Sequence, residues 1–492
     1  MEKRNIVFLM TDQQRFDALG VVNPRVKTPN LDALAKDGVL YAQAVCNCPM
    51  CVPSRYSMML GLYPSQIGVR HNMQMIERDE KLPAKPFAQR LSEAGYQTAC
   101  FGKTHWFIGE YDIAPAVSGV VPSKRGFDVR YETGKRPSAD RTDTVYLSEL
   151  KHKAPNPWAG VDKIVTQRGG EDVAGYVGKT CEAPTETMGD YQKASLAIDW
   201  VVNRRNPDQP FFLYLSLNKP HAPLTAPAEF EALYDIDQIP DTPLPPPDWT
   251  LYEHTTPWRH REAWAKLDAQ TKRRTTLRYW ALCSYSDAQF GRLIGALKAQ
   301  GLYENTDFIF CSDHGDSLGE RYRFSKYSLY EPSVRVPLIV RSARIAPAQR
   351  GSVDSRPAEL VDVLPTLLDF AGLDCPDEFP GRSLLAPPCR EGQFAEFSGS
   401  GYHEVQYGPK YMWRRDGYKL VLHVPGKVPD ALTRLDSVIG ELYNLKEDPL
   451  EIDNLYEDPA HFALRERMTR QLLTHLMICW AKFPRGMSTT RV

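Results

Sequence analysis

Short, continuous apolar runs alternate with stretches of helical periodicity along the first 385 residues. Continuous apolar runs of about four to eight residues are typical of buried strands, and a period near 3.6 is typical of amphipathic helices. The alternation predicts an α/β fold with a large, mostly parallel or mixed sheet flanked by helices. We expect strands at residues 6–10, 98–101, 211–217, 307–311 and 337–340, and helices at residues 29–36, 85–94, 190–203, 275–299 and 359–371.

The best-marked of these helices is at residues 29–36. Pro29 is favourable at a first helical position, Thr28 is the expected N-terminal cap, and Gly38 follows the last turn. Two long stretches, in contrast, match no regular period. Residues 113–184 are rich in Gly, Pro and charge, and residues 222–260 contain the turn-forming sequence Pro-Leu-Pro-Pro-Pro-Asp-Trp. We interpret both as long surface excursions that take part in substrate selection.

The pattern changes past Pro380-Gly381-Arg382. Short strand-like runs then predominate, followed by one late helix. The sequence therefore predicts a catalytic α/β domain, residues 1–385, and a smaller C-terminal α+β domain, residues 386–492. The expected elements of the second domain are strands at 393–397, 411–413 and 418–423 and a helix near 463–480.

Composition limits the class of protein. The chain has 60 Lys and Arg against 61 Asp and Glu, so its formal net charge of −1 gives no overall field that favours nucleic acid or an anionic membrane. The apolar run at residues 6–10 is too short for a signal peptide or a membrane span, and we expect a cytoplasmic protein. Ten cysteines scattered over a long chain are typical of reduced thiols. Because the net charge is close to zero, any anion site must be local.

Polar residues follow four of the predicted strands. In open α/β sheets, ligands bind at the carboxyl ends of the strands, so these residues are expected to converge although they are far apart in sequence. Aspartate side chains among them offer the hard oxygen ligands that divalent cations prefer. The residues are Asp12 and Gln13, Lys103 and His105, His221, and Asp313 and His314.

Cys51 opens the sequence Cys51-Val52-Pro53-Ser54-Arg55, which leads into a helical run at 56–60. The partial positive charge at a helix N-terminus favours anionic chemistry. The alternatives are a buried structural thiol, a redox dithiol of Cys48 and Cys51, and a three-thiolate metal cluster that adds Cys46. The dithiol leaves the distant polar clusters unexplained, and a closed metal site normally needs a fourth ligand.

The motifs together resemble the type I sulfatases of the alkaline phosphatase superfamily. Cys-x-Pro-Ser-Arg is the signature of that family for oxidation of cysteine to formylglycine, and the other matches occur in the family's order over most of the chain. These are Asn5-Ile6-Val7 before Asp12, Thr28-Pro29-Asn30-Leu31-Asp32, Gly102-Lys103-Thr104-His105, Pro220-His221-Ala222-Pro223, Ser312-Asp313-His314-Gly315, Lys326 before Tyr330-Glu331, and Glu441-Leu442-Tyr443-Asn444-Leu445.

The resemblance implies a metal-dependent hydrolase of sulfate monoesters. A maturation enzyme would convert Cys51 to formylglycine, and the metal ligands would be Asp12, Gln13, residue 51, Asp313 and His314. Calcium is the first choice for the cation. Manganese is the second, because an imidazole ligand admits manganese more readily than a carbonyl oxygen does.

The same resemblance implies roles for the catalytic residues. Asp313 would accept a proton as the hydrated aldehyde attacks sulfur, and Arg55 would orient the diol. His221, with Lys326, would protonate the departing alcohol. His105 would then take the proton of the second hydroxyl, so that inorganic sulfate is expelled.

The nearest alternative is a phosphonate monoester or phosphodiester hydrolase of the same superfamily. It shares the formylglycine and the Asp-Gln and Asp-His metal set, but tends to carry neutral hydroxyl residues at the positions of Lys103 and His105. That basic pair favours sulfate, whose oxygens Lys103 would hold. A binding protein without the chemistry is the third class, and the complete set of catalytic positions argues against it.

Two features of the C-terminal part bear on partners. The tyrosine-rich and basic run at residues 402–419 is expected to form part of the pocket rim. The apolar and basic tail at residues 480–492 is a candidate contact with a second copy of the chain, as in a homo-oligomer. The alcohol of the substrate, whether aryl, choline-like or saccharide, is not encoded in any motif that we recognise.

Overall fold

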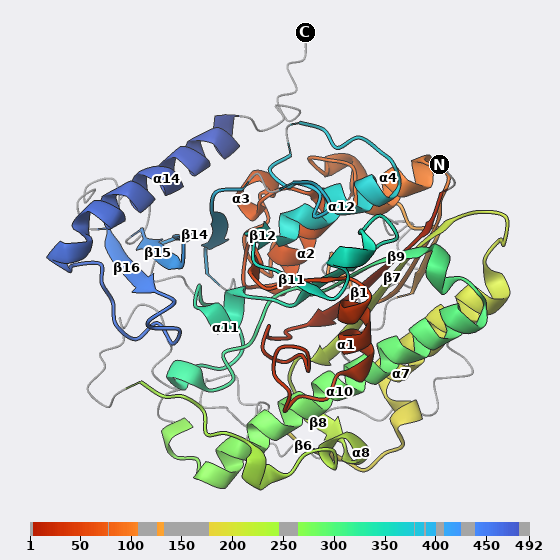
Figure 1. The fold of residues 1–492 in the computed structure, drawn as a ribbon, viewed down its shortest axis with the longest axis horizontal. Helices are drawn as coiled ribbons and strands as arrows, with labels where there is room; N and C mark the ends of the chain where they lie inside the picture. Colours follow the sequence, from red (N-terminus) through yellow and green to blue (C-terminus); the bar gives the residue numbers. More distant parts are fainter. Residues whose placement is uncertain are drawn as a thin grey trace.

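The computed structural model describes residues 3–76, 78–106, 125–131, 177–245, 264–377, 379–387, 390–399, 408–424 and 438–481. Its centre is an eight-stranded sheet in the order β11-β2-β10-β9-β1-β7-β4-β5 (Figure 1). All neighbours are parallel except β10, which is antiparallel to β9 and β2. The predicted α/β class with a mostly parallel sheet is confirmed. The strands are β1 Asn5–Asp12, β2 Val39–Tyr41, β4 Gln97–Gly102, β5 Val129–Tyr131, β7 Phe211–Pro220, β9 Thr306–Ser312, β10 Leu338–Arg341 and β11 Ser352–Asp354.

Helices cover both faces of this sheet (Figure 1). Successive side chains of a strand point to opposite faces, and β1 shows this directly. Val7 and Leu9 pack into one hydrophobic core, whereas Phe8 and Met10 pack into the other. The first core includes α1 Pro29–Lys36, α7 Gly189–Asp199 and α10 Ala269–Ala299, and the second includes α2 Cys51–Leu60, α4 Phe87–Glu93 and α12 Val363–Phe370.

The C-terminal part forms a separate antiparallel sheet in the order β13-β14-β15-β16. Its last helix, α14 Phe462–Ala481, packs on β14 and β15 (Figure 1). The predicted strands and late helix are confirmed here, and a fourth strand was not predicted. The strands are β13 Gln393–Phe397, β14 Lys410–Arg415, β15 Tyr418–His423 and β16 Ile439–Asn444. The boundary between two domains at residue 385 stays a prediction.

The two stretches without a predicted period contain regular elements, so that prediction was wrong in part. Strand β6 Lys179–Cys181 pairs in parallel with β8 Thr225–Pro227, and the short helix α8 Ala228–Glu231 follows directly. Three-residue strands are too short to show a period in the sequence. Residues 132–176 and 246–263 lie outside the described residues.

Thr28 occupies the predicted N-cap position of helix α1, but its side chain makes no capping hydrogen bond. Its hydroxyl donates to Asp32 Oδ1 at 3.0 Å and makes no hydrogen bond to the first turn of main-chain N–H groups. The carboxylate of Asp287, on α10, accepts from the main-chain nitrogens of Asn30 at 3.2 Å and Leu31 at 2.7 Å instead. Burial raises the pKa of Asp287 to about 7. A tertiary contact therefore replaces the local cap.

Two smaller differences concern helix boundaries. The predicted helix at residues 359–371 begins later, because β12 Ala358–Glu359 and the 3-10 turn η9 Leu360–Asp362 precede α12. Beyond α7, the helical path continues as the π-turn η4 Trp200–Arg204.

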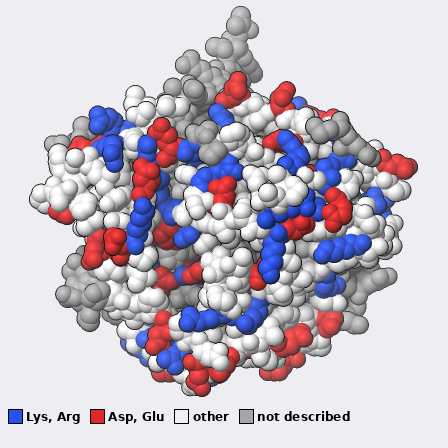
Figure 2. Space-filling view, in the orientation of Figure 1, with Lys and Arg blue, Asp and Glu red and all other residues white. Residues whose placement is uncertain are grey.

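Among the described residues, no helix is long and apolar enough to cross a bilayer. Basic and acidic side chains are interspersed over the face drawn in Figure 2.

Candidate active site

Four adjacent parallel strands, in the order β9-β1-β7-β4, end at one edge of the sheet. Asp12 is the last residue of β1, and Asp313, His221 and Lys103 each follow directly on β9, β7 and β4. Lys103 Nζ contacts Asp12 Oδ2, and His314 Nε2 lies 3.8 Å from Asp12 Oδ1. The sheet thus brings together residues that are far apart in sequence, as in the bond from the Gln13 main chain to Asp313, 300 positions away.

Four buried side chains form a group suited to a cation: Asp12, Cys51, Asp313 and His314. One potential ligand atom from each lies within 4.8 Å of all the others. His314 Nδ1 is 2.9 Å from the carbonyl oxygen of Gly315. An Nδ1–H donated to that carbonyl leaves Nε2 as the acceptor, turned toward Cys51 Sγ at 3.2 Å. Two carboxylates and one imidazole fit a divalent cation in charge and ligand type.

Gln13 lies beside this group with its main chain at φ 75°. Its N–H donates to Asp313 Oδ1 at 3.0 Å, and its side-chain oxygen accepts from Lys326 Nζ at 2.8 Å. The side-chain nitrogen donates to Asp316, three residues beyond Asp313, which the sequence analysis did not select. Gln13 as a metal ligand stays a prediction, because its oxygen is engaged by Lys326.

Helix α2 begins at Cys51, as its position before a helical run predicted. Arg55, one turn further, lies on the same side of the helix. Its guanidinium donates to Asp313 Oδ2 at 2.7 Å, to Asp12 Oδ2 at 3.2 Å and to Ser216 Oγ at 3.0 Å. Arg55 thereby connects α2 to three strands. Ser216, in the interior of β7, carries no motif that would have identified it.

The charges around Cys51 favour an anion. Lys326 Nζ lies 3.1 Å and Lys103 Nζ 3.8 Å from its Sγ. Burial alone would raise the pKa of the thiol, but the charges of Lys103 and Lys326 outweigh it, so the pKa lies well below its ordinary value. A hydrogen bond from His105 acts in the same direction. The centre is thus built for a negatively charged group.

The neighbouring cysteines differ from Cys51. Burial raises the pKa of both Cys46 and Cys48 well above the ordinary value, and Cys46 Sγ contacts the carbonyl oxygen of Ser333 at 3.7 Å. Every cysteine that the structure describes is free of a disulfide. Protonated, buried thiols are poor nucleophiles and poor metal ligands. The dithiol and thiolate-cluster alternatives are therefore disfavoured.

The two carboxylates have opposite pKa shifts. Burial alone would raise the pKa of Asp12, but the charges of Lys103 and His221 outweigh it and hold the pKa far below its ordinary value. Burial raises the pKa of Asp313, and the negative charge of Asp12 adds to the effect. Of the two, Asp313 is the better proton acceptor.

Gly102 explains how Lys103 reaches the site. Its φ is 108°, and a Cβ there would lie 1.9 Å from the carbonyl oxygen of Ser216. Only glycine lets the end of β4 approach β7 so closely, and the next N–H, of Lys103, donates to that same carbonyl at 3.1 Å. His105 follows with φ 59°. The turn in Gly-Lys-x-His thus directs the basic pair inward.

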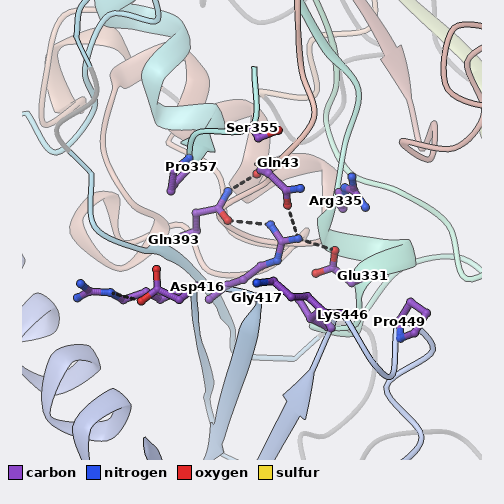
Figure 3. A pocket seen from close by; sticks show the side chains of 13 residues that line it. Gln43, Glu331, Arg335, Ser355, Pro357, Gln393, Asp416, Gly417, Lys446 and Pro449 are labelled. Atoms are coloured by element: carbon purple, nitrogen blue, oxygen red, sulfur yellow. Dashed lines mark hydrogen bonds and ion pairs between the residues drawn. The ribbon is translucent and has the colours of Figure 1, made fainter. Parts of the chain in front are cut away.

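A hollow of about 400 Å³ lies between the main sheet and the C-terminal sheet (Figure 3). Across it, the Arg414 guanidinium donates to Gln43 Oε1 at 2.5 Å, Gln393 Oε1 at 2.8 Å and Glu331 Oε2 at 3.2 Å. None of the predicted catalytic or metal-binding residues is among those that line it, although residues 414–417 of the proposed rim are. We assign this hollow to the contact between the two sheets.

The C-terminal sheet also contacts the segment that follows Lys326. Lys419 Nζ donates to the carbonyl oxygen of Leu329 at 3.0 Å, and the Tyr330 hydroxyl donates to Glu441 Oε2 at 2.9 Å. These contacts agree with the expected position of the C-terminal part beside the site. Of the proposed rim at residues 402–419, residues 402–407 lie outside the described residues.

Comparison with known proteins supports one family. The family model described as "Sulfatase" matches residues 4–373, and the model described as "N-sulphoglucosamine sulphohydrolase, C-terminal" matches residues 319–477. An arylsulfatase of Clostridium perfringens is 31% identical over 465 residues, which cover 92% of this chain and 90% of the relative.

Solved structures share the fold. A phosphonate monoester hydrolase from Silicibacter pomeroyi has a TM-score of 0.74 at 25% identity. The match covers 96% of this chain and 95% of that chain. A structure in complex with its substrate D-glucosamine-2-N,6-O-disulfate has a TM-score of 0.70 at 19% identity, with 99% of this chain and all of that chain covered. The family model spans well over half of the sequence, so the chain belongs to the sulfatase family of the alkaline phosphatase superfamily and is a sulfuric ester hydrolase.

Proposed function

We propose that this sulfatase hydrolyses a sulfate monoester to an alcohol and inorganic sulfate, with a formylglycine made from Cys51 and one divalent cation, calcium by first choice. The observation that carries the proposal is the position of Cys51 at the start of α2, with Lys326 and Lys103 at 3.1 and 3.8 Å from its Sγ. A hydrated aldehyde supplies both a nucleophilic hydroxyl and a second hydroxyl for release of sulfate, and a divalent cation adds Lewis acidity.

The residues that would hold the cation are Asp12, Asp313 and His314 together with residue 51. They fit because their ligand atoms are already close together and buried. Two carboxylates balance the charge of a divalent cation, so the adjoining Lys103 and Lys326 would leave the occupied site positive before the sulfate binds. Cys51 is only 1% exposed, so we infer that the maturation enzyme acts on the chain before it folds.

Two basic side chains next to residue 51 would bind the sulfate. Lys103 and Lys326 are both buried and can donate to sulfate oxygens, where they stabilise charge that develops in the transition state. Asp313 has the raised pKa that suits a proton acceptor. Arg55 holds Asp313 and Asp12 in register with the helix that carries residue 51.

Two histidines would move protons. His221 Nδ1 lies 2.7 Å from the carbonyl oxygen of Ala222, which leaves Nε2 to donate a proton to the departing alcohol oxygen. His105, on the other side, contacts residue 51 and would accept a proton from it when sulfate leaves. The acid and the base therefore come from different strands, β7 and β4.

The alternative is a phosphonate monoester or phosphodiester hydrolase. It is favoured by the structural likeness to the Silicibacter pomeroyi enzyme at 25% identity. Lys103 argues for sulfate, because the resemblance places neutral hydroxyl residues there in phosphonate hydrolases. A basic residue so close to residue 51 adds a direct contact to the sulfate group.

A paired assay tests the choice. A sulfate ester and a phosphonate ester with the same aryl leaving group are compared in the wild type and in the Lys103→Ala/His105→Ala variant. We expect the variant to lose sulfatase activity at least ~100-fold more than phosphonate hydrolase activity, since proton transfer and charge stabilisation each contribute about 10²-fold or more. Lys85→Ala, at an exposed ion pair with Glu93, is the matched control and should change neither. Equal loss of both activities in the double variant would overturn the preference for sulfate.

A further inference from the structure

The loop that carries His221 is anchored by the first turn of helix α7. Asp190 accepts from the main-chain nitrogens of Asn218 and Lys219, each at 2.9 Å. Lys193 Nζ links helix α7 to the end of β7, because it donates to Asp190 Oδ1 at 2.7 Å and to Asn218 Oδ1 at 2.8 Å. The exit of β7 is thus fixed before the chain reaches the histidine.

Lys219 anchors the same loop from within. Its side chain, 8% exposed, turns back so that Nζ donates to the carbonyl oxygens of His221 at 3.1 Å and Pro223 at 2.6 Å. Burial lowers the pKa of Lys219 to about 8, and the charge of Lys193 adds to this, although Asp190 opposes it. A buried ammonium is costly to maintain. Its N–H groups donate to main-chain carbonyl oxygens of the loop that carries His221.

This placement bears on acid catalysis. A general acid contributes only when its proton is within hydrogen-bond reach of the leaving oxygen, and a shift of about 1 Å can cost ~100-fold in rate. The bonds from Lys219 hold the carbonyl group of His221 itself and that of Pro223, two residues further along the loop.

We propose that Lys219 is a positioning residue for the leaving-group acid: it fixes the main chain of His221 so that the proton on Nε2 faces the ester oxygen. As the S–O bond breaks, its electron pair stays on that oxygen, which takes the proton from Nε2. The inference rests on the proposed role of His221. It assigns to Lys219 a function that the Pro-His-x-Pro motif alone does not indicate.

The dependence of rate on the leaving group distinguishes positioning from simple structural support. We would measure kcat/KM for a series of aryl sulfates, from acidic nitrophenols to weakly acidic phenols. Lys219→Met should change the rate less than about 3-fold for the most acidic phenol but lower it ~10- to 100-fold for the least acidic, because only poor leaving groups need the proton. His221→Ala should show the same slope, and the double variant should be no worse than His221→Ala.

Further variants keep the test decisive. Lys219→Arg retains charge and donors and should restore most of the loss, while Lys219→Gln retains a donor without the charge. Arg341→Met removes another buried cation, which pairs with Asp37 and Glu304 away from the site, and should leave the slope of the wild type. All variants are compared at equal folded fraction by circular dichroism.

Three results would overturn the inference. The first is a dependence of rate on the leaving group that appears in His221→Ala but is absent from both Lys219→Met and Lys219→Gln. The second is that the effects of substitution at the two positions simply add. Either result would overturn the inference while leaving the role of His221 intact. A uniform loss in His221→Ala over all esters would instead refute the assignment of His221 as the acid, and this inference with it.

Discussion

Arg55 Nε donates to Asp313 Oδ2 at 2.7 Å, and both side chains are fully buried. The same guanidinium reaches Asp12, so one residue holds the two carboxylates of the candidate metal site. Because Arg55 and Cys51 share helix α2, the nucleophile position and the metal ligands form one connected unit. Arginine suits this role since its planar fork can bond two carboxylates at once.

Arg55→Lys should therefore be severe although it conserves charge. A lysine cannot reach Asp12, Asp313 and Ser216 together, and each lost charge-assisted bond is worth about 1.5–3 kcal/mol. We expect kcat/KM to fall at least ~100-fold. Steady-state kinetics on an aryl sulfate, with the metal content measured in parallel, checks this.

Arg341→Lys is the matched control for that change. Arg341 is 1% exposed and pairs with Asp37 and Glu304, away from the site. It should lower the melting temperature and leave kcat per folded molecule unchanged. If Arg55→Lys behaved in the same way, Arg55 would be a structural residue only.

Gly102→Ala should also damage the site through the main chain. Its Cβ would meet the Ser216 carbonyl oxygen at 1.9 Å, so β4 must move and Lys103 with it. We expect at least ~10-fold loss of kcat/KM. Gly372→Ala, at φ 68° with nothing within 4 Å of its Cβ, separates backbone strain from the clash and should cost only about 1 kcal/mol of stability. Similar activity losses in both variants would contradict the explanation.

Much of this arrangement could be predicted from the sequence. Strands β1, β7 and β9 were predicted from continuous apolar runs, and helix α1 was predicted with the bounds that it has. The convergence of Asp12 and Asp313 followed from a general rule about the carboxyl edge of such sheets. These features depend on local patterns several residues long.

The rest depends on tertiary contacts that leave no local pattern. Asp287 caps a helix 257 positions away, and Ser216 binds Arg55 from a strand interior. Strands of two or three residues, such as β3 Ala44–Val45, exist only because a partner strand is present. Lys219 is similar, since its role becomes visible only once its ammonium is seen to turn back onto the loop.

His314→Ala should weaken the cation site. Its Nε2 faces the other three potential ligands, so its loss should lower metal affinity at least ~10-fold. Calorimetric titration of chelator-treated protein with calcium and manganese measures this. His475→Ala is the control, because His475 is packed against Tyr63 and Trp413, where burial lowers its pKa to about 4. Unchanged affinity in His314→Ala would exclude it as a ligand.

Asp287 should make stability depend on pH. Burial raises its pKa from the ordinary 3.8 to about 7, so the folded state binds a proton more tightly than the unfolded state does. The stability that this proton contributes is present below pH 3.8 and is lost as pH rises toward about 7. In thermal melts, the melting temperature of the wild type should fall relative to that of Asp287→Asn as pH rises over that interval. A constant difference between the two would mean that Asp287 does not titrate there.

Peptide mass spectrometry tests whether residue 51 acts as a formylglycine. The chain is produced with and without a formylglycine-generating enzyme, and the peptide containing residue 51 is quantified in both preparations alongside sulfatase activity. We predict that activity rises in proportion to the fraction of aldehyde and that Cys51→Ala is inactive in both. Full sulfatase activity in a preparation that contains only unmodified Cys51 would contradict the account.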